Sequence, residues 1–181
     1  MTRADAVYPY PIGKAAPNKH LAELLEPLVS ELGGTLSETT TDVNADIPLE
    51  KLGQFVEALN QRSALQFDML RNISGVDLEA EGLALKYHFY SFKHGHALQV
   101  TVATAYEGAH VQTLTGLYPA ADWHEREAAE MFGFTFDGHP NPKNLLLEED
   151  LHIHPLLKAH PLQKVEIKQG IEAGPPGVIL S

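Results

Sequence analysis

The sequence predicts an α+β domain, a two-layer sandwich in which two helices cover a mixed sheet, with an irregular C-terminal extension. Two segments, residues 18–34 and 48–62, carry apolar residues at helical spacing. Two neighbouring runs, residues 83–92 and 97–105, alternate apolar and polar residues as the strands of a hairpin do. From residue 134 onward proline and histidine are frequent and periodicity is weak, which is typical of a functional or partner-bound segment.

The first expected helix begins at Asn18, a suitable N-cap, and ends at Gly33 and Gly34. Its apolar positions are Leu21, Leu24, Leu25, Leu28 and Leu32. Pro27 is expected to kink or shorten it, because proline cannot donate a helical hydrogen bond. The second helix has Pro48 in its first turn, and one face carries Leu52, Phe55, Val56 and Leu59.

The remaining sheet elements follow from composition and turn residues. Residues 35–48 are rich in threonine and valine and predict a strand pair or a bent strand. Residues 67–77 predict a strand that ends at Gly75. The alternating hairpin turns around Gly95. We therefore expect an N-terminal arm over residues 1–17, the α+β domain over residues 18–135, and an extended arm for partner subunits over residues 136–181.

Composition excludes several classes of protein. The chain has 181 residues, with 13 Lys and Arg against 24 Asp and Glu, which gives a net charge of −11. Such a chain repels phosphate backbones, so nucleic acid is not an expected partner. It contains no cysteine, which excludes disulfides and cysteine ligation of iron–sulfur clusters by this chain. No apolar run has the roughly 18–20 residues of a membrane helix, so direct membrane insertion is not expected.

Common catalytic and cofactor motifs are absent. The sequence lacks GxGxxG, GxxxxGK[ST], GxSxG and HExxH, so we predict no catalytic, cofactor-binding or metal-binding residues for this chain. One alternative stays open, a stand-alone metal-binding protein that uses His139, His152, His154 and His160. A stand-alone enzyme has the weakest support, because no nucleophile or cofactor cradle accompanies the carboxylates.

The segment from residue 118 to residue 133 is the most informative. It predicts a helix with Trp123, Arg126, Glu127 and Glu130 on one side. The other side carries Ala128, Ala129 and Phe132, with Glu125 among them. The charged residues fit paired catalytic carboxylates, a solvated face, or a buried ion network in which Arg126 bridges the carboxylates. We hypothesise the ion network, in which Arg126 joins the three glutamates and fixes the helix against its neighbours.

The residues WHEREAAEMFGFTFDGHP, from Trp123 to Pro140, resemble the signature of the 30 kDa subunit of NADH:quinone oxidoreductase, respiratory complex I. The family pattern has E-R-E, a further acidic residue, two apolar residues, a glycine and then G-H-P. The matching residues are Glu125, Arg126, Glu127, Glu130, Met131, Phe132, Gly133, Gly138, His139 and Pro140. The resemblance is sharpest over residues 118–162. It implies that these positions, with Trp123, Pro155 and Lys158, form the family signature and partner interface.

The resemblance implies a subunit without a redox cofactor, in the peripheral arm at the cytoplasmic face of the cell membrane. FMN, iron–sulfur clusters and quinone are then expected on partner subunits, including the large quinone-site subunit and the small iron–sulfur subunit. The implied role is structural support of the quinone-reducing module while electrons pass from NADH to quinone and ions are pumped. The alternative is the homologous subunit of an energy-converting membrane hydrogenase or of a formate hydrogenlyase complex.

Some family positions differ in this chain. After G-H-P the family usually continues D-L-R-R-I-L, whereas residues 141–146 here read NPKNLL. Two expected arginines and an expected aspartate are replaced by Asn144, Leu157 and Ala159. Lys143 and Lys158 keep a positive charge without the planar guanidinium fork. We therefore expect the partner surface to differ from the usual one.

Overall fold

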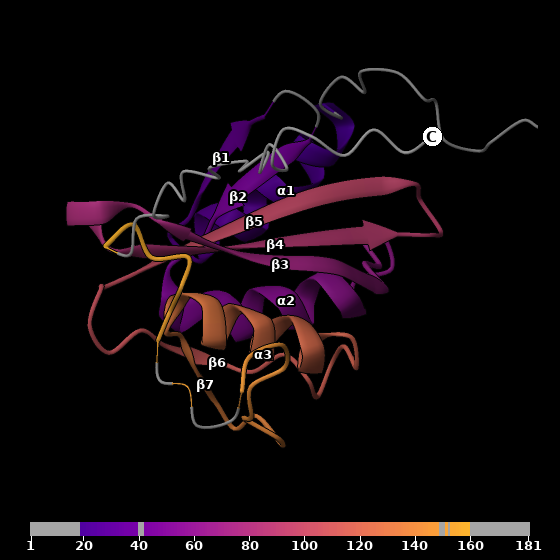
Figure 1. Cartoon of the computed structure of the whole chain (residues 1–181). Helices are drawn as coiled ribbons and strands as arrows, with labels where there is room; N and C mark the ends of the chain where they lie inside the picture. Colours follow the sequence, from indigo (N-terminus) through magenta and orange to yellow (C-terminus); the bar gives the residue numbers. More distant parts are fainter. Residues whose placement is uncertain (1–18, 40–41, 149–150, 152, 160–181) are drawn as a thin grey trace, which may run out of the picture.

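A five-stranded mixed sheet forms the centre of the molecule (Figure 1). The structure is a computed structural model and describes residues 19–39, 42–148, 151 and 153–159. The expected N-terminal arm, the Asn18 cap and residues 160–181 of the expected C-terminal arm lie outside the described residues. The strands of the sheet are β1 (Thr35–Glu38), β2 (Val43–Asp46), β3 (Met69–Asp77), β4 (Leu83–Ser91) and β5 (His96–Thr104).

The sheet order is β1-β2-β5-β4-β3, and only the β2–β5 pair is parallel. The predicted α+β class with a mixed sheet is confirmed. The predicted hairpin is β4–β5, whose nine paired positions run without a break from Leu83↔Thr104 to Ser91↔His96. Strand β3 does not end at Gly75 but continues to Asp77, because β4 pairs with it as far as Leu83.

Helix α1 (Lys19–Glu31) runs through Pro27, so the alternative that the proline shortens the helix is wrong, while the expected kink stays a prediction. The helix buries Leu25 before the proline and Leu28 after it, so packing on both sides offsets the lost hydrogen bond. The helix ends at Glu31, and the expected Gly33 lies in the turn that follows, where its φ is +74°. Such a left-handed conformation favours glycine, because it has no Cβ.

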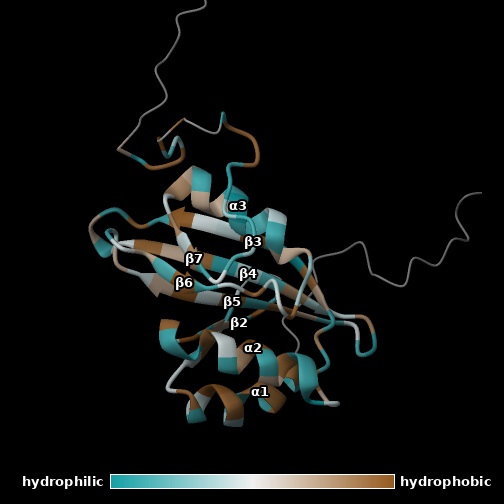
Figure 2. Cartoon of the chain, turned by 90° about the horizontal axis from the view of Figure 1, so that it is seen from below, coloured by the Kyte–Doolittle hydropathy of each residue, from teal (hydrophilic) through white to brown (hydrophobic). Residues whose placement is uncertain are grey.

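Helix α2 (Leu52–Gln61) follows a 3-10 turn, η2 (Leu49–Lys51), and a second 3-10 turn, η3 (Glu79–Glu81), joins β3 to β4. Helix α3 (Ala121–Phe132) lies on the same side of the sheet as α2 in Figure 1. In Figure 2, α3 lies beside β3, while α1 and α2 lie towards β2. A third helix therefore adds to the two that the sequence placed on the sheet.

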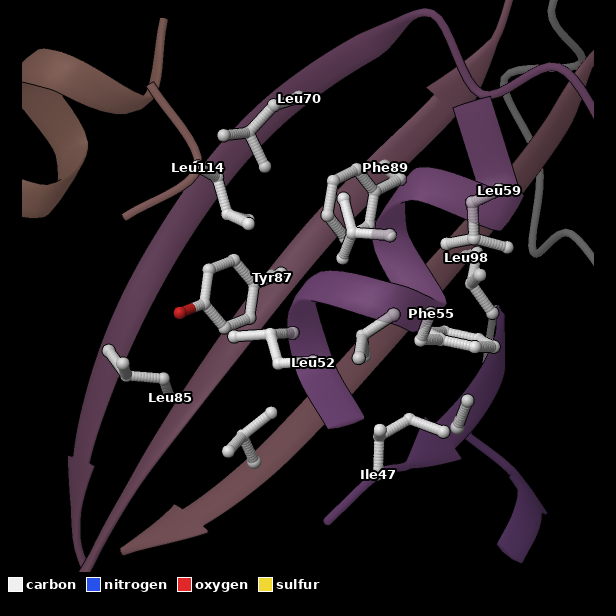
Figure 3. Close-up of a cluster of buried hydrophobic side chains, with 14 of the residues drawn as sticks. Ile47, Leu52, Phe55, Leu59, Leu70, Leu85, Tyr87, Phe89, Leu98 and Leu114 are labelled. Atoms are coloured by element: carbon white, nitrogen blue, oxygen red, sulfur yellow. The ribbon is translucent and has the colours of Figure 1, made fainter. Parts of the chain in front are cut away.

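One hydrophobic core joins these helices to the sheet (Figure 3). Phe55 of α2 and Tyr87, Phe89 and Leu98 of the sheet are almost completely buried there. The Tyr87 hydroxyl has no hydrogen-bond partner in the described part of the chain, and burial raises its pKa well above the usual value for tyrosine. The ring therefore acts as an apolar filler of the core.

The opposite face of the sheet is polar. Cross-strand register places Ser37, Asn44, Gln99, His88 and Asn72 in one row across all five strands. The Gln99 side chain donates to Asn44 Oδ1 at 2.9 Å, and Asn44 Nδ2 donates to Ser37 Oγ at 3.1 Å. This alternation explains why β4 and β5 read so clearly as strands.

A second, two-stranded parallel sheet carries the chain into and out of α3. Its strands are β6 (His110–Gln112) and β7 (Thr135–Asp137). Phe134 and Phe136 are buried and Thr135 and Asp137 are exposed, so β7 alternates as a half-buried strand. The strand ends two residues beyond the predicted domain boundary at residue 135. Within the described residues, none of the helices combines the length and apolarity that a bilayer crossing demands.

Candidate functional site: helix α3 and the C-terminal segment

Helix α3 is fixed to the domain at its C-terminal end. Gly133 ends the helix in a left-handed conformation with φ of +85°, and its N–H donates to Ala129 O at 2.8 Å. The preceding residue, Phe132, lays its ring on Gly75 of β3, where a Cβ would overlap with the ring. A residue without a side chain in β3 therefore allows the close approach of α3.

Glu125 faces inward from α3 and its side chain is completely buried. The carboxylate accepts hydrogen bonds from the Leu114 N–H at 2.7 Å and from Thr113 Oγ1 at 2.6 Å. Burial raises the pKa of Glu125, although these two hydrogen bonds oppose the rise. Glu125 thus ties the loop after β6 to the helix.

His139 contacts the first turn of α3. Its side chain is 2% exposed, and its Nε2 lies 3.1 Å from Asp122 O. Its Nδ1 accepts the Asn141 N–H at 3.0 Å, which assigns the ring proton to Nε2. The imidazole therefore joins the first turn of α3 to the chain that leaves β7.

We use the name C-terminal segment for the described residues 138–148, 151 and 153–159, which fold back along α3 (Figure 1). Glu130, which is 4% exposed, accepts the main-chain N–H groups of Leu145, Leu146 and Leu147 at 2.8–3.2 Å. A carboxylate held by several N–H groups is a strong, charge-assisted anchor. The single side chain of Glu130 therefore fixes three consecutive peptide groups.

Arg126 holds the residues immediately before these with the opposite polarity. Its Nε donates to Lys143 O and its Nη2 donates to Asn144 O, both at 2.7 Å. Arg126 thus binds carbonyl groups, whereas Glu130 binds N–H groups, so two neighbouring turns of α3 fix the direction of the main chain. Asn144 adds a tie within the segment through Nδ2, which donates to Glu148 O at 2.8 Å.

The hypothesis of an ion network around Arg126 is wrong. Within the described residues Arg126 binds main-chain oxygens, while Glu125 and Glu130 accept from donors elsewhere in the chain. Glu130 is also buried and not on an open face of the helix, because the returning chain covers it. Glu127 and Trp123 remain exposed, and Trp123 keeps 65% of its surface in solvent.

Three further contacts anchor the end of the C-terminal segment. His154 Nδ1 lies 2.9 Å from Glu130 O, and the Leu156 N–H donates to Met131 O at 3.2 Å. Two residues later the Lys158 N–H donates to Asp77 Oδ2 at 2.8 Å. The predicted site residues Pro155 and Lys158 thus lie beside α3 and β3, in a stretch held at three points.

The two histidines of the alternative metal site that the structure describes, His139 and His154, do not meet. His139 and His154 contact carbonyl oxygens at opposite ends of α3, namely Asp122 O and Glu130 O. No group of three or more potential metal ligands occurs among the described residues. His152 and His160, the other two members of the alternative metal site, lie outside them.

A hollow of about 530 Å³ lies between α3, β7 and the C-terminal segment. The same segment also carries apolar side chains that are exposed to solvent. Leu146, Ile153 and Leu156 keep 66%, 48% and 56% of their surface in solvent. The arrangement combines a firmly held main chain with exposed apolar side chains, which is typical of a docking surface and not of a catalytic centre.

Comparison with known proteins agrees with the family resemblance of residues 123–140. Residues 45–166 match the family model described as respiratory-chain NADH dehydrogenase, 30 Kd subunit. The chain belongs to this family. An NADH-quinone oxidoreductase subunit of Salinispora arenicola is 32% identical over 163 residues, which is 86% of this chain and 66% of that protein, just under two thirds of its length. A subunit of the same enzyme from Rhizobium meliloti is 36% identical over 135 residues, 72% of this chain and 74% of that protein.

Two solved structures share the fold of the 30 kDa subunit family. The Nqo5 trypsin-resistant fragment (1-134) is 25% identical, with a TM-score of 0.60 over 67% of this chain and 98% of that one. A chain of the membrane-bound sulfane sulfur reductase, an archaeal respiratory membrane complex, is 20% identical, with a TM-score of 0.68 over 80% of this chain and 87% of that one. The second likeness is evidence of the fold alone.

The sequence analysis did not predict the role of several residues that fix α3 and the C-terminal segment. Thr113, Leu114, Asp77 and Gly75 carry no motif, because three of them act through hydrogen bonds and one through the absence of a side chain. The alternation of Phe134 and Phe136 with polar residues is the signal in the sequence that corresponds to β7. It is only three residues long, which is below the length at which alternation identifies a strand.

The raised pKa of Glu125 predicts a specific pH dependence of stability. A carboxyl with a raised folded-state pKa contributes most below the ordinary pKa of glutamate, and this contribution is lost as pH rises through the raised value. We compare the free energy of unfolding of the wild type with that of Glu125→Gln. The advantage of the wild type should fall from about pH 4 towards neutral pH. Urea unfolding of both chains across that range measures it, and a difference that is independent of pH would contradict it.

The contribution of Asp77 to stability has the opposite pH dependence. Hydrogen bonds from the Lys158 and Glu79 N–H groups lower its pKa, so its anchor is present above the ordinary aspartate pKa and is lost as pH falls through the lowered one. We expect Asp77→Asn to speed tryptic cleavage after Lys158 several-fold at neutral pH. Glu79→Gln, which removes only the exposed ion pair with Lys158, is the control and should leave the rate near wild type. Equal rates in all three chains would exclude the anchor.

Proposed function

We propose that this chain is a non-redox structural subunit in the peripheral arm of a proton-translocating NADH:quinone oxidoreductase. It supports the quinone-reducing module while electrons pass from NADH to quinone. The observation that carries the proposal is the use of the signature residues. Arg126, Glu130 and His139 all bind main-chain atoms of their own chain, so they position the segment that returns along α3.

The C-terminal segment and Trp123 of α3 supply the contact surface in this proposal. Trp123, Leu146, Ile153 and Leu156 are exposed, and burying a side chain of this size contributes about 1.5–3 kcal/mol. The partners we propose are the large quinone-site subunit and the small iron–sulfur subunit. We propose the cytoplasmic face of the membrane as the location, with FMN, iron–sulfur clusters and quinone held by partner subunits.

The experiment is a pull-down of the tagged chain from gently solubilised native membranes, with the co-purifying chains identified by mass spectrometry. Recovery of a flavin-containing NADH-binding subunit with iron–sulfur and membrane subunits supports the proposal. Recovery of a hydrogenase or formate dehydrogenase large subunit replaces it with the alternative complex. Recovery of the tagged chain alone contradicts both.

The same pull-down tests the role of Arg126. Arg126→Ala removes two charge-assisted hydrogen bonds to the main chain, each worth about 1.5–3 kcal/mol when formed by a charged group. We expect the variant to keep its circular dichroism spectrum and to lose most of its partner subunits. Arg126→Lys is the matched variant, because it keeps the charge without the fork and should recover assembly only in part. Normal assembly with lost turnover would instead assign Arg126 a catalytic role.

A further inference from the structure

Strand β3 forms one edge of the five-stranded sheet (Figure 1). It is nine residues long and pairs with β4 on one side, and no strand pairs with its other side in the described part of the chain. The strand at the opposite edge of the sheet, β1, has only four residues. A long free edge offers a row of main-chain groups to any other strand, so proteins usually cover such an edge.

The strand register identifies the main-chain groups at this edge. The Leu78 N–H donates to Gly82 O at 2.9 Å, so hydrogen-bonded pairs with β4 recur at every second residue of β3 from this point. The residues between these pairs are Ile73, Gly75 and Asp77, whose main-chain groups point away from β4. None of these groups is hydrogen-bonded within the described residues. Three N–H groups and three carbonyl groups are therefore open to a further strand.

The C-terminal segment brings the following part of the chain to the same edge. The Lys158 N–H donates to Asp77 Oδ2 at 2.8 Å, and Lys158 Nζ donates to Glu79 Oε1 at 2.8 Å. Leu157, immediately before, packs on the hydrophobic core. The chain is thus fixed at the carboxyl end of β3, so residues that continue from this point along the edge run antiparallel to the strand.

The sequence after this anchor has the pattern of a half-buried strand. Residues 163–169 read QKVEIKQ, in which two β-branched residues, Val165 and Ile167, alternate with charged residues. Pro161 precedes this run, so every residue of the run has a main-chain N–H to donate. Residues 159–162 remain for the connection from the anchor, which is an ordinary length for a loop between two strands.

We propose that residues 163–169 form a sixth strand, antiparallel to β3, on the open edge of the sheet. Residues that oppose one another in a sheet share a face, and Gly75 faces the core together with its β4 partner, Leu85. Val165 and Ile167 therefore lie on the core face, and the charged residues between them lie on the polar face.

The added strand holds the C-terminal segment at its far end, whereas Glu130 holds it on α3. It also closes the long edge against association with other strands. The edge and the segment that covers it belong to one chain, so the inference does not depend on the proposed function.

The absence of cysteine from the sequence allows a direct test by disulfide trapping. Ser74 lies on the polar face of β3, opposite Lys86. Ser74→Cys is combined in the isolated full chain with a second cysteine at one position between 164 and 168, and each double variant is oxidised gently. Only side chains on the same face approach closely enough for a disulfide. We expect the bond with a cysteine at position 164, 166 or 168, and not with Val165→Cys or Ile167→Cys.

Three other outcomes overturn the inference. No bond at any of the five positions means that the segment does not reach the edge of β3. Equal bond formation at all five positions contradicts a strand, because the side chains of a strand alternate between two faces. Bonds between two chains assign the edge to a second copy of the protein.

A matched pair of proline variants gives a measurement without cysteine. Val165 and Ile167 share the face of Gly75, so their N–H groups bond to β3 in the proposed pairing, and the N–H group of Lys168 points away from it. We expect Ile167→Pro to speed amide exchange in peptides that cover residues 72–78 of the isolated full chain about fivefold, the effect of one lost hydrogen bond. Lys168→Pro should leave the exchange near the wild-type rate. Equal exchange in the wild type and both variants overturns the inference.

Discussion

Glu130→Ala should release the C-terminal segment from α3 while the five-stranded sheet stays folded. The change removes the acceptor of three main-chain N–H groups, at Leu145, Leu146 and Leu147. Leaving such donors without a partner costs about 2 kcal/mol, which corresponds to more than a tenfold rise in local opening. Amide hydrogen exchange followed by mass spectrometry measures this rise in peptides that cover residues 143–148.

Glu127→Ala is the matched control, because Glu127 belongs to the same helix and is exposed. Its exchange rates over residues 143–148 should equal those of wild type. Strand β4 should stay protected in both variants, since Glu130 contacts no residue of the sheet in these hydrogen bonds. Unchanged exchange in Glu130→Ala would show that the other anchors hold the segment without this carboxylate.

Gly75→Ala should displace helix α3 from strand β3. A Cβ on Gly75 would overlap with the Phe132 ring, so the ring or the helix that carries it must shift. Overpacking of this kind destabilises a protein by about 1–3 kcal/mol. Chemical denaturation should show the loss, and assembly should weaken with it because α3 carries the anchors of the C-terminal segment.

A second substitution separates overlap from other causes. Phe132→Ala in the Gly75→Ala background creates room for the new methyl group, so the double variant should lose less stability than the sum of the single variants. Gly116→Ala is the control for a glycine change, because a Cβ there would meet no atom within 4 Å. Strict additivity of Gly75→Ala and Phe132→Ala would exclude the contact as the cause.

The fold was predictable where periodic patterns are long. The alternation over residues 83–91 and 96–104 identified β4 and β5, because one face packs on the core and the other is polar. The parallel pairing of β2 with β5 could not be read from the sequence, because it joins residues 55 positions apart, such as Val43 and Leu98. Pro27 does not shorten α1, because tertiary packing on the helix outweighs a local helix breaker.

The site was predictable as a helix and as a motif, but not in its contacts. Helical periodicity put Glu130 on the same side as Glu127, whereas the chain that returns along α3 buries one and leaves the other exposed. Arg126 and Glu130 bind peptide groups, which every residue possesses, so no side-chain pattern identifies their partners. The family resemblance identified these residues as important, and the structure shows which main-chain groups they bind.

The parallel β2–β5 pair also limits the order in which the elements can join the sheet while the chain is being synthesised. Strands β3, β4 and β5 follow one another and pair antiparallel, so they can form a local meander. The β1–β2 hairpin and α1 precede them, yet the hairpin reaches the sheet only through β5. The hairpin can therefore join the sheet only after β5 has been made, and until then α1 has only β1 and β2 of the sheet to pack on.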